Sequence, residues 1–219
     1  MTSLLDSVAL AAEKQALRRR IEALRLVADQ KDGPDAARAI MHHVVANLSE
    51  IGIHAGMIVS GYWPMSTEID VRPLLARLEQ HQVICALPVV LARNEPLIFR
   101  RWHPCDALEN GVFETMHPLT GAPEVRPDVV IAPLLAVDRE GYRLGQGGGY
   151  YDRTLSALRR QGPVVVVGVG YRVQFVERVP RGGLDQKVDW IVTDAGLVQA
   201  TSEGAVAGKG DFGPMKERP

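Results

Sequence analysis

The sequence has little cysteine, no long apolar run and no excess of charge of either sign. Its two cysteines, Cys85 and Cys105, lack the C-x-x-C or Cys/His spacing of a metal site, which argues against a disulfide scaffold and a zinc centre. No stretch approaches the roughly 18 consecutive apolar residues that a membrane span requires. The 25 Lys and Arg residues balance 26 Asp and Glu residues and are dispersed along the chain. The sequence therefore indicates neither a membrane partner nor a nucleic-acid partner.

The chain is long enough to fold without disulfides or a structural metal. At 219 residues, roughly 70% of the surface of the unfolded chain can be buried. We expect a single domain over residues 1–200 and a disordered C-terminal tail over residues 201–219, where small and polar residues cannot pack a core. The first twenty residues carry acidic groups before basic ones, the reverse of a signal peptide, which predicts a cytoplasmic protein. Within an apolar run, Cys85 should act as a small buried residue.

Hydrophobic periodicity indicates helices alternating with short buried strands. Apolar residues recur near a 3.6-residue period over the first part of the chain, and Asp32-Gly33-Pro34 predicts a break before a second helix over residues 35–50. Two further helices are expected, one capped by Asp70 and one over residues 150–161. The segment 100–127 lacks periodicity, so it is either an active-site loop or a small excursion. The expected strands lie at residues 57–59, 83–87, 97–99, 129–131, 164–167 and 190–192. This alternation predicts an α/β layered sheet.

The glycine-rich segment between residues 143 and 152 is the strongest chemical signal in the chain. Four glycines (145, 147, 148 and 149) remove the Cβ atoms where the chain enters a helix, so backbone N–H groups can surround phosphate oxygens. The segment is not a Walker A loop, and Tyr150 replaces the last glycine of G-x-G-x-x-G. A merely flexible loop is the alternative. The flanking Arg143 and Asp152 favour a phosphate site, since they add a cation and a candidate metal ligand.

Three weaker signals lie outside this loop, and each has a plain alternative. Glu68 follows the first predicted strand and can project into a cleft, or it can be a solvated carboxylate. Asp185 precedes a strand and can reach a magnesium ion over the glycine loop, or it can pair with Lys187 on the surface. Lys14 and Arg18 share one face of the first helix, which can bind a ligand or simply face water. No histidine pair has zinc spacing, and there is no G-x-S-x-G nucleophile motif.

In this order, the motifs resemble the 5-formyltetrahydrofolate cyclo-ligase family over residues 10–194. The resemblance lies in Lys14-x-x-Leu17-Arg18, Glu68-Ile69-Asp70, the string R-L-G-Q-G-G-G-Y-Y-D that starts at residue 143, and the Asp185 segment. It implies an enzyme that uses ATP and Mg²⁺ to close 5-formyltetrahydrofolate to 5,10-methenyltetrahydrofolate, releasing ADP and phosphate through a phosphorylated formyl intermediate. It also implies a three-layer α/β/α fold with a mostly parallel central sheet, of the NagB/RpiA/CoA-transferase-like type.

The resemblance also implies a role for each matched residue. ATP would be bound by Lys14, Arg18, Arg143, Leu144, Gly145, Gln146, Gly147, Gly148, Gly149, Tyr150 and Tyr151. The folate would be bound by Tyr62, Met65, Glu68, Trp102, Gln146 and Tyr150. Asp152 and Asp185 would hold Mg²⁺, and Glu68, Arg143 and Tyr151 would act in catalysis. The expected partners are small molecules only, and the expected state is a monomer.

The sequence departs from the family pattern in two places. Gln146 and Gly148 stand where some relatives have basic residues, so the loop would bind phosphates through backbone N–H groups, Arg143 and metal. The segment 180–184 lacks the acidic residue and histidine that often precede the metal-binding aspartate, which leaves Asp185 and Asp189 as alternatives. Two other functions are considered: a non-catalytic nucleotide- or folate-binding regulator, and an enzyme similar to phosphosugar isomerases.

Overall fold

The computed structural model describes residues 4–112 and 115–201, in which a seven-stranded sheet forms the centre of the molecule. Its strands are β1 (Ile58–Ser60), β2 (Ile84–Val89), β3 (Ile98–Arg101), β6 (Val129–Pro133), β9 (Val165–Val169), β10 (Trp190–Thr193) and β11 (Gly196–Gln199), in the spatial order β11-β10-β9-β6-β1-β2-β3. The five inner strands run parallel, whereas β3 and β11 pair antiparallel at the two edges. The predicted α/β class with a mostly parallel sheet is confirmed.

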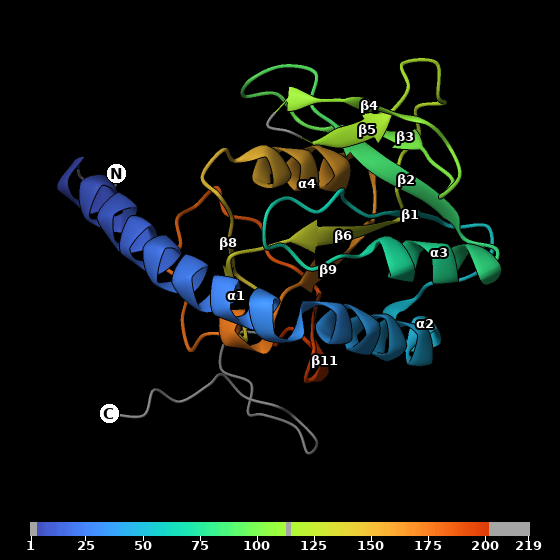
Figure 1. The fold of residues 1–219 in the computed structure, drawn as a ribbon. Helices are drawn as coiled ribbons and strands as arrows, with labels where there is room; N and C mark the ends of the chain where they lie inside the picture. The colour runs from blue at the N-terminus through green and yellow to red at the C-terminus, as the bar shows by residue number, and fades with distance from the viewer. Residues whose placement is uncertain (1–3, 113–114, 202–219) are drawn as a thin grey trace.

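Helices cover both faces of this sheet (Figure 1). They are α1 (Leu4–Ala46), α2 (Leu48–Ile51), α3 (Arg72–Gln80) and α4 (Tyr150–Gln161). Side chains of β6 alternate between the two layers: Val129 and Ile131 pack in the cluster with α1 and α3, while Val130 and Ala132 pack in the cluster with α4. Because successive strand residues point to opposite faces, each inner strand contributes to both cores. The fold is therefore the predicted three-layer arrangement.

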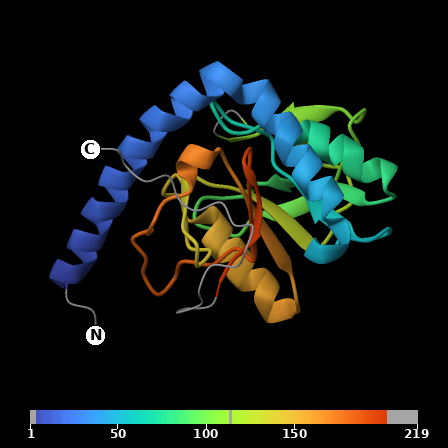
Figure 2. The same cartoon turned by 90° about the horizontal axis from the view of Figure 1, so that it is seen from below.

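The predicted break in the first helix is wrong, because α1 runs unbroken for 43 residues with Pro34 inside it. Figure 2 shows that the helix bends around the body of the protein, and an internal proline bends a helix by removing a backbone hydrogen bond. Buried side chains hold the helix after the proline against the sheet, among them Ala37, Ile40 and Val44. Before the proline, Leu17 and Ile21 pack in a separate small cluster. Packing on both sides of Pro34 outweighs the local signal for a helix end.

Of the remaining expectations, those for α4 and Cys85 are confirmed and that for the cap of α3 is wrong. Helix α4 spans the predicted residues, with Gly149 as its N-cap. Asp70 is not the N-cap of α3, a position held by Val71; its carboxylate instead accepts hydrogen bonds from the backbone and side chain of Arg72. Cys85 is 1% exposed in β2, and burial raises the pKa of its thiol to about 12.

The segment 100–127 contains a separate two-stranded sheet of β4 (Leu108–Asn110) and β5 (Met116–Pro118), as one of its two predicted forms, a small excursion, requires. A second small pair, β7 (Ala136–Val137) and β8 (Arg143–Leu144), leads into the glycine loop. The predicted tail lies, apart from Thr201, outside the described residues. None of the helices in residues 4–112 and 115–201 combines the length and the apolar composition needed to cross a lipid bilayer.

Candidate active site

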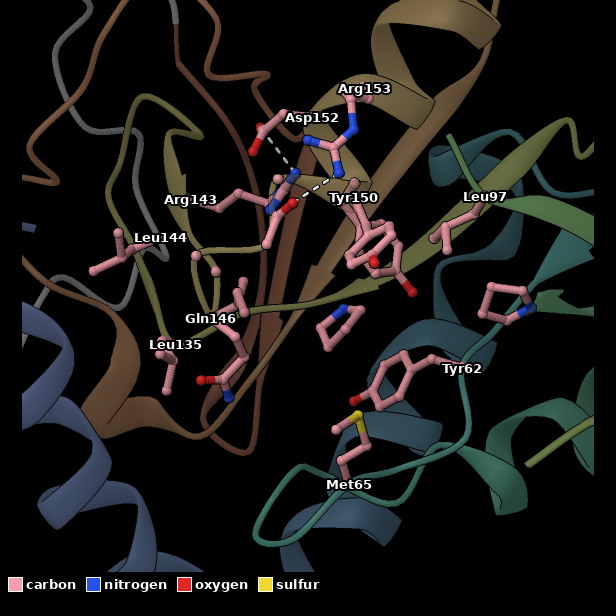
Figure 3. A pocket seen from close by; sticks show the side chains of 18 of the residues that line it. Tyr62, Met65, Leu97, Leu135, Arg143, Leu144, Gln146, Tyr150, Asp152 and Arg153 are labelled. Atoms are coloured by element: carbon pink, nitrogen blue, oxygen red, sulfur yellow. Dashed lines mark hydrogen bonds and ion pairs between the residues drawn. The ribbon is translucent and has the colours of Figure 1, made fainter. Parts of the chain in front are cut away.

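A large open cavity of about 1380 Å³ lies where the parallel strands end. Its lining includes residues of α1, of the loop that follows β1, of the connection between β2 and β3, of the end of β6, of the glycine loop with the start of α4, and of the segment 183–186. In Figure 3, Tyr62 and Met65 lie on one side of this space and Gln146 on the other. Ligands of open α/β sheets bind beyond the carboxyl ends of the strands. The cavity is therefore the candidate active site.

The structure brings all but one of the predicted site residues to this cavity. Its lining includes Lys14, Arg18, Tyr62, Met65, Glu68, Arg143, Leu144, Gly145, Gln146, Gly147, Gly148, Gly149, Tyr150, Tyr151, Asp152 and Asp185. These positions are spread over more than 170 residues of sequence, so the fold itself assembles them. No histidine belongs to the lining that the structure describes.

The exception is Trp102, which we predicted as an aromatic wall for the substrate. It does not line the cavity and is 4% exposed, with its ring edge-on to Trp63 at a centroid distance of 6.4 Å. Strand β3 runs antiparallel to β2, so it carries Trp102 back toward the start of β2, where the backbone N–H of Trp102 donates to the Cys85 carbonyl. Trp63, which the sequence analysis did not select, lines the cavity instead.

The glycine loop has the backbone conformation that its composition predicts. Gly147 and Gly149 have φ values of +105° and +67°, which residues other than glycine rarely adopt. Arg18 from α1 donates from Nε to the Gly145 carbonyl at 2.9 Å, and Arg153 from α4 donates to the Gly148 carbonyl at 2.7 Å. The loop is thus held from two sides at the N-terminus of α4, where the helix dipole favours an anion.

Two ion pairs place a cation against each carboxylate at the rim of the loop. Arg143, whose side chain is 2% exposed, donates from Nη2 to Asp152 Oδ1 at 2.9 Å. Lys14 Nζ lies 2.7 and 2.6 Å from the two carboxylate oxygens of Asp185. Asp185 therefore does not make the predicted alternative pair with Lys187, whose Nζ lies 4.5 Å from the centre of the Tyr142 ring.

Asp189 does not reach the cavity. Its Oδ2 accepts the backbone N–H of Val166 at 2.7 Å and lies 3.7 Å from Arg159. It therefore holds β9 and the start of β10 together. Of the two aspartates left open by the sequence, only Asp185 lines the cavity.

Glu68 is a further carboxylate of the cavity, and it lies on the turn after β1. Its Oε2 accepts the backbone N–H of Met65 at 3.0 Å. Burial raises the pKa of Glu68, while the Met65 hydrogen bond and the charge of Arg25 oppose this change. Tyr62 donates its hydroxyl to the Ile69 carbonyl at 2.9 Å, which ties the two ends of the turn together. Burial raises the pKa of both Tyr62 and Tyr151, so both stay phenols at neutral pH.

Comparison with known proteins identifies the family of this chain. The sequence profile of the 5-formyltetrahydrofolate cyclo-ligase family matches residues 10–194. The chain belongs to this family. It is 30% identical over 184 residues to the 5-formyltetrahydrofolate cyclo-ligase of Escherichia coli K12, covering 81% of this chain and 96% of that protein. The corresponding protein of Haemophilus influenzae is 28% identical and is covered over 90% of its length.

Solved structures give the same result for the fold of this cyclo-ligase family member. The NMR structure of Aquifex aeolicus 5,10-methenyltetrahydrofolate synthetase matches with a TM-score of 0.71 and 26% identity, covering 90% of this chain and 97% of that one. A 5,10-methenyltetrahydrofolate synthetase from Mycoplasma pneumoniae matches with a TM-score of 0.65 and 24% identity, covering 83% of this chain and 99% of that one.

The carboxylates of this cyclo-ligase family member fit a magnesium ion that is shared with phosphates. Asp152 and Asp185 line the same cavity, but no cluster of three or more metal-ligating side chains occurs among residues 4–112 and 115–201. Mg²⁺ usually keeps several waters and binds to one or two carboxylates together with substrate phosphates. The donor set therefore suits a magnesium–phosphate complex rather than a metal ion held by protein alone.

We expect Glu68→Gln to stabilise the protein at neutral pH. The folded state raises the pKa of Glu68, so the native protein holds this proton more tightly than the unfolded chain. The resulting loss of stability is absent below the unfolded pKa of about 4.5 and develops as pH rises through the folded pKa. Urea unfolding between pH 4 and 8 should show a higher midpoint for the variant at pH 7 and no difference at pH 4.

Asp70→Asn is the matched control with the opposite sign. Partial burial raises the pKa of Asp70, while the hydrogen bonds and the charge of Arg72 lower it. The combined effect of Arg72 is larger, so the pKa of Asp70 is lowered. Its variant should lose stability at neutral pH, and this difference should shrink as pH falls through the lowered pKa. If both variants shifted in the same direction, the account of Glu68 would be wrong.

Sequence reasoning missed Arg25, which also lines the cavity. It lies 7 residues after Arg18 and 11 after Lys14, so the three cations follow one face of α1. Its Nε donates to Thr67 Oγ1 at 2.9 Å. The helical spacing was the available signal, but it does not reveal which turn of α1 meets the loop after β1.

Proposed function

We propose that this protein catalyses the ATP- and Mg²⁺-dependent cyclisation of 5-formyltetrahydrofolate to 5,10-methenyltetrahydrofolate, with release of ADP and phosphate. The observation that carries the proposal is the single cavity in which the glycine loop, cations of α1, two rim carboxylates and Glu68 meet. Family membership supports it, because the relatives bear the name of this activity. We also propose that the protein acts on small molecules as a monomer in the cytoplasm.

The glycine loop, Lys14, Arg18 and Arg143 would bind the triphosphate. Backbone N–H groups at the start of α4 offer donors without side chains, which suits the positions of Gln146 and Gly148. Asp152 and Asp185 would hold Mg²⁺, which supplies charge neutralisation at the phosphates. Lys14 and Arg143 now pair with these same carboxylates. We expect binding to transfer the two cations to phosphate oxygens.

The chemistry needs positioned charge rather than a protein nucleophile. A formamide is a poor electrophile, so its oxygen attacks the γ-phosphorus, and the bond from that phosphorus to ADP breaks. The product is an O-phosphorylated iminium at N5, on which N10 closes a new C–N bond. N10 then gives up its proton and phosphate leaves, which yields the methenyl bridge. Arg143 stabilises charge on the transferring phosphoryl group.

The folate would lie between the turn after β1 and the glycine loop. The same cavity is lined by Tyr62, Met65, Gln146 and Tyr150, which would surround the folate ring system. Glu68 would lie near N5 and stabilise the positive charge of the iminium. Tyr151, which lies 5.5 Å from the Arg143 guanidinium, would line the junction between nucleotide and folate.

The direct test is to mix the purified protein with 5-formyltetrahydrofolate, ATP and magnesium. The conjugated methenyl product should appear through its near-ultraviolet absorbance, and omission of any one component should leave background only. Flat absorbance with folate still bound would favour the non-catalytic regulator. Binding of phosphate esters without ATP use would favour the isomerase-like alternative, and failure to bind folate or ATP would refute the proposed function.

A further inference from the structure

Arg25 is a buried cation in the lining of the cavity. The residue is 5% exposed, and its Nε bond to Thr67 fixes the guanidinium beside the turn that carries Glu68. Its Nη1 is buried and has no hydrogen-bond partner in the part of the chain that the structure describes. Buried donors in native proteins are nearly always satisfied, so an unpaired one in a ligand cavity calls for a functional explanation.

The hydrogen bond to Thr67 holds the Arg25 side chain in place. Arginine retains its proton in proteins, so the group is a permanent donor that accepts nothing. Its charge acts on Glu68 and Tyr62 in the cavity and on Tyr171, whose hydroxyl donates to Asp29 at 2.9 Å one turn further along α1. A rigid, buried guanidinium beside a carboxylate selects ligands that present an oxygen acceptor at that point.

We infer that Arg25 is a specificity-determining residue that donates a hydrogen bond to the C4 carbonyl oxygen of the folate ring. This inference rests on the proposed function. C4 and N5 are both bonded to C4a, so the carbonyl lies next to the formyl-bearing nitrogen. Arg25 donates to Thr67, which precedes Glu68 in the sequence, and all three residues line the cavity. Glu68, near N5, and Arg25, at the carbonyl, would thus recognise neighbouring groups of the substrate.

The inference predicts discrimination against a ligand that carries a donor in place of this oxygen. Replacing the C4 carbonyl by an amino group turns an acceptor into a donor and places it against a guanidinium that can only donate. Sites built around a buried polar group reject ligands that leave it unpaired. We expect the wild-type protein to bind 5-formyltetrahydrofolate about 100-fold more tightly than its 4-amino counterpart.

The test measures both dissociation constants by calorimetry for the wild type, Arg25→Met and Thr67→Val. Arg25→Met should bind the two folates with nearly equal affinity, because it removes the donor. Thr67→Val removes the anchor but retains the guanidinium, so it should bind both folates less tightly and still prefer the carbonyl compound. Binding of ATP, measured separately, should be unchanged in Arg25→Met, which shows that the variant is folded.

The other possible outcomes of these measurements would overturn the inference. If Arg25→Met loses affinity for both folates equally, Arg25 is structural and the inference is overturned. Equal binding of the two folates by the wild type overturns it without any variant. If the wild type binds neither folate, the proposed function fails as well, which separates the two failures.

Discussion

Asp185→Asn is expected to lower magnesium-dependent turnover about 100-fold and, in the same protein, to strengthen the binding of metal-free ATP. The first effect follows if Asp185 holds the ion that neutralises the triphosphate. The second follows from its present partner: both carboxylate oxygens bind Lys14 Nζ, so a neutral side chain releases that cation for phosphate. A variant that merely damaged the site would weaken both kinds of binding.

Calorimetry with Mg·ATP, and with ATP in the presence of EDTA, separates these effects. Lys14→Ala should weaken both forms, because it removes the cation rather than releasing it. Glu140→Gln is the matched control, since it breaks a comparable ion pair with Arg181 at 2.6 Å that does not line the cavity. Near-normal turnover of Asp185→Asn would remove its metal role, and unchanged metal-free binding would contradict the ion-pair account.

Gly147→Val is expected to raise the KM for ATP roughly 10- to 100-fold while leaving the protein folded. At a φ of +105°, a β-branched side chain is strained by about 1–3 kcal/mol, so the loop will leave the conformation that presents its N–H groups. A Cβ would also lie 3.5 Å from the Arg18 guanidinium, which a larger side chain would displace. The KM for folate should change much less.

Gly56→Val controls for the strain alone. Gly56 has a φ of +83° in a turn before β1, and a Cβ there meets nothing within 4 Å. The variant should lose stability comparable to that of Gly147→Val and keep the wild-type KM for ATP. If the two variants had the same kinetics, the glycine loop would not be a phosphate site.

Two structural features that depend on a short segment, the entry into α4 and the burial of Cys85, were predicted correctly from the sequence. The glycines before residue 150 and the apolar face that follows them predict both the start of α4 and the conformation of its entry loop. The same holds for Cys85, whose neighbours are all apolar. In these cases the local preference and the tertiary structure agree, as they do in most foldable sequences.

Asp70 fails as a helix cap for a local reason, because it pairs with Arg72 two residues away, whereas the other differences depend on partners that are distant in sequence. Asp185 lines the cavity as predicted, but the sequence did not indicate its pair with Lys14, 171 residues away. Trp102 is directed away from the cavity because β3 runs antiparallel, and strand direction at a sheet edge is decided by tertiary packing. Pro34 resembles a helix end locally, but packing on both sides of it maintains α1.

The two parts of the bent helix α1, before and after Pro34, contribute differently to the protein. After Pro34 its buried side chains build the core, whereas before it Lys14 and Arg18 contact the glycine loop and the rim. Surveys that score variants by protein abundance or melting temperature will detect damaging substitutions in the part after Pro34. They will overlook substitutions of Lys14 and Arg18. A sequence change there can yield a well-expressed protein that is inactive, so only a ligand-binding or turnover assay can classify it.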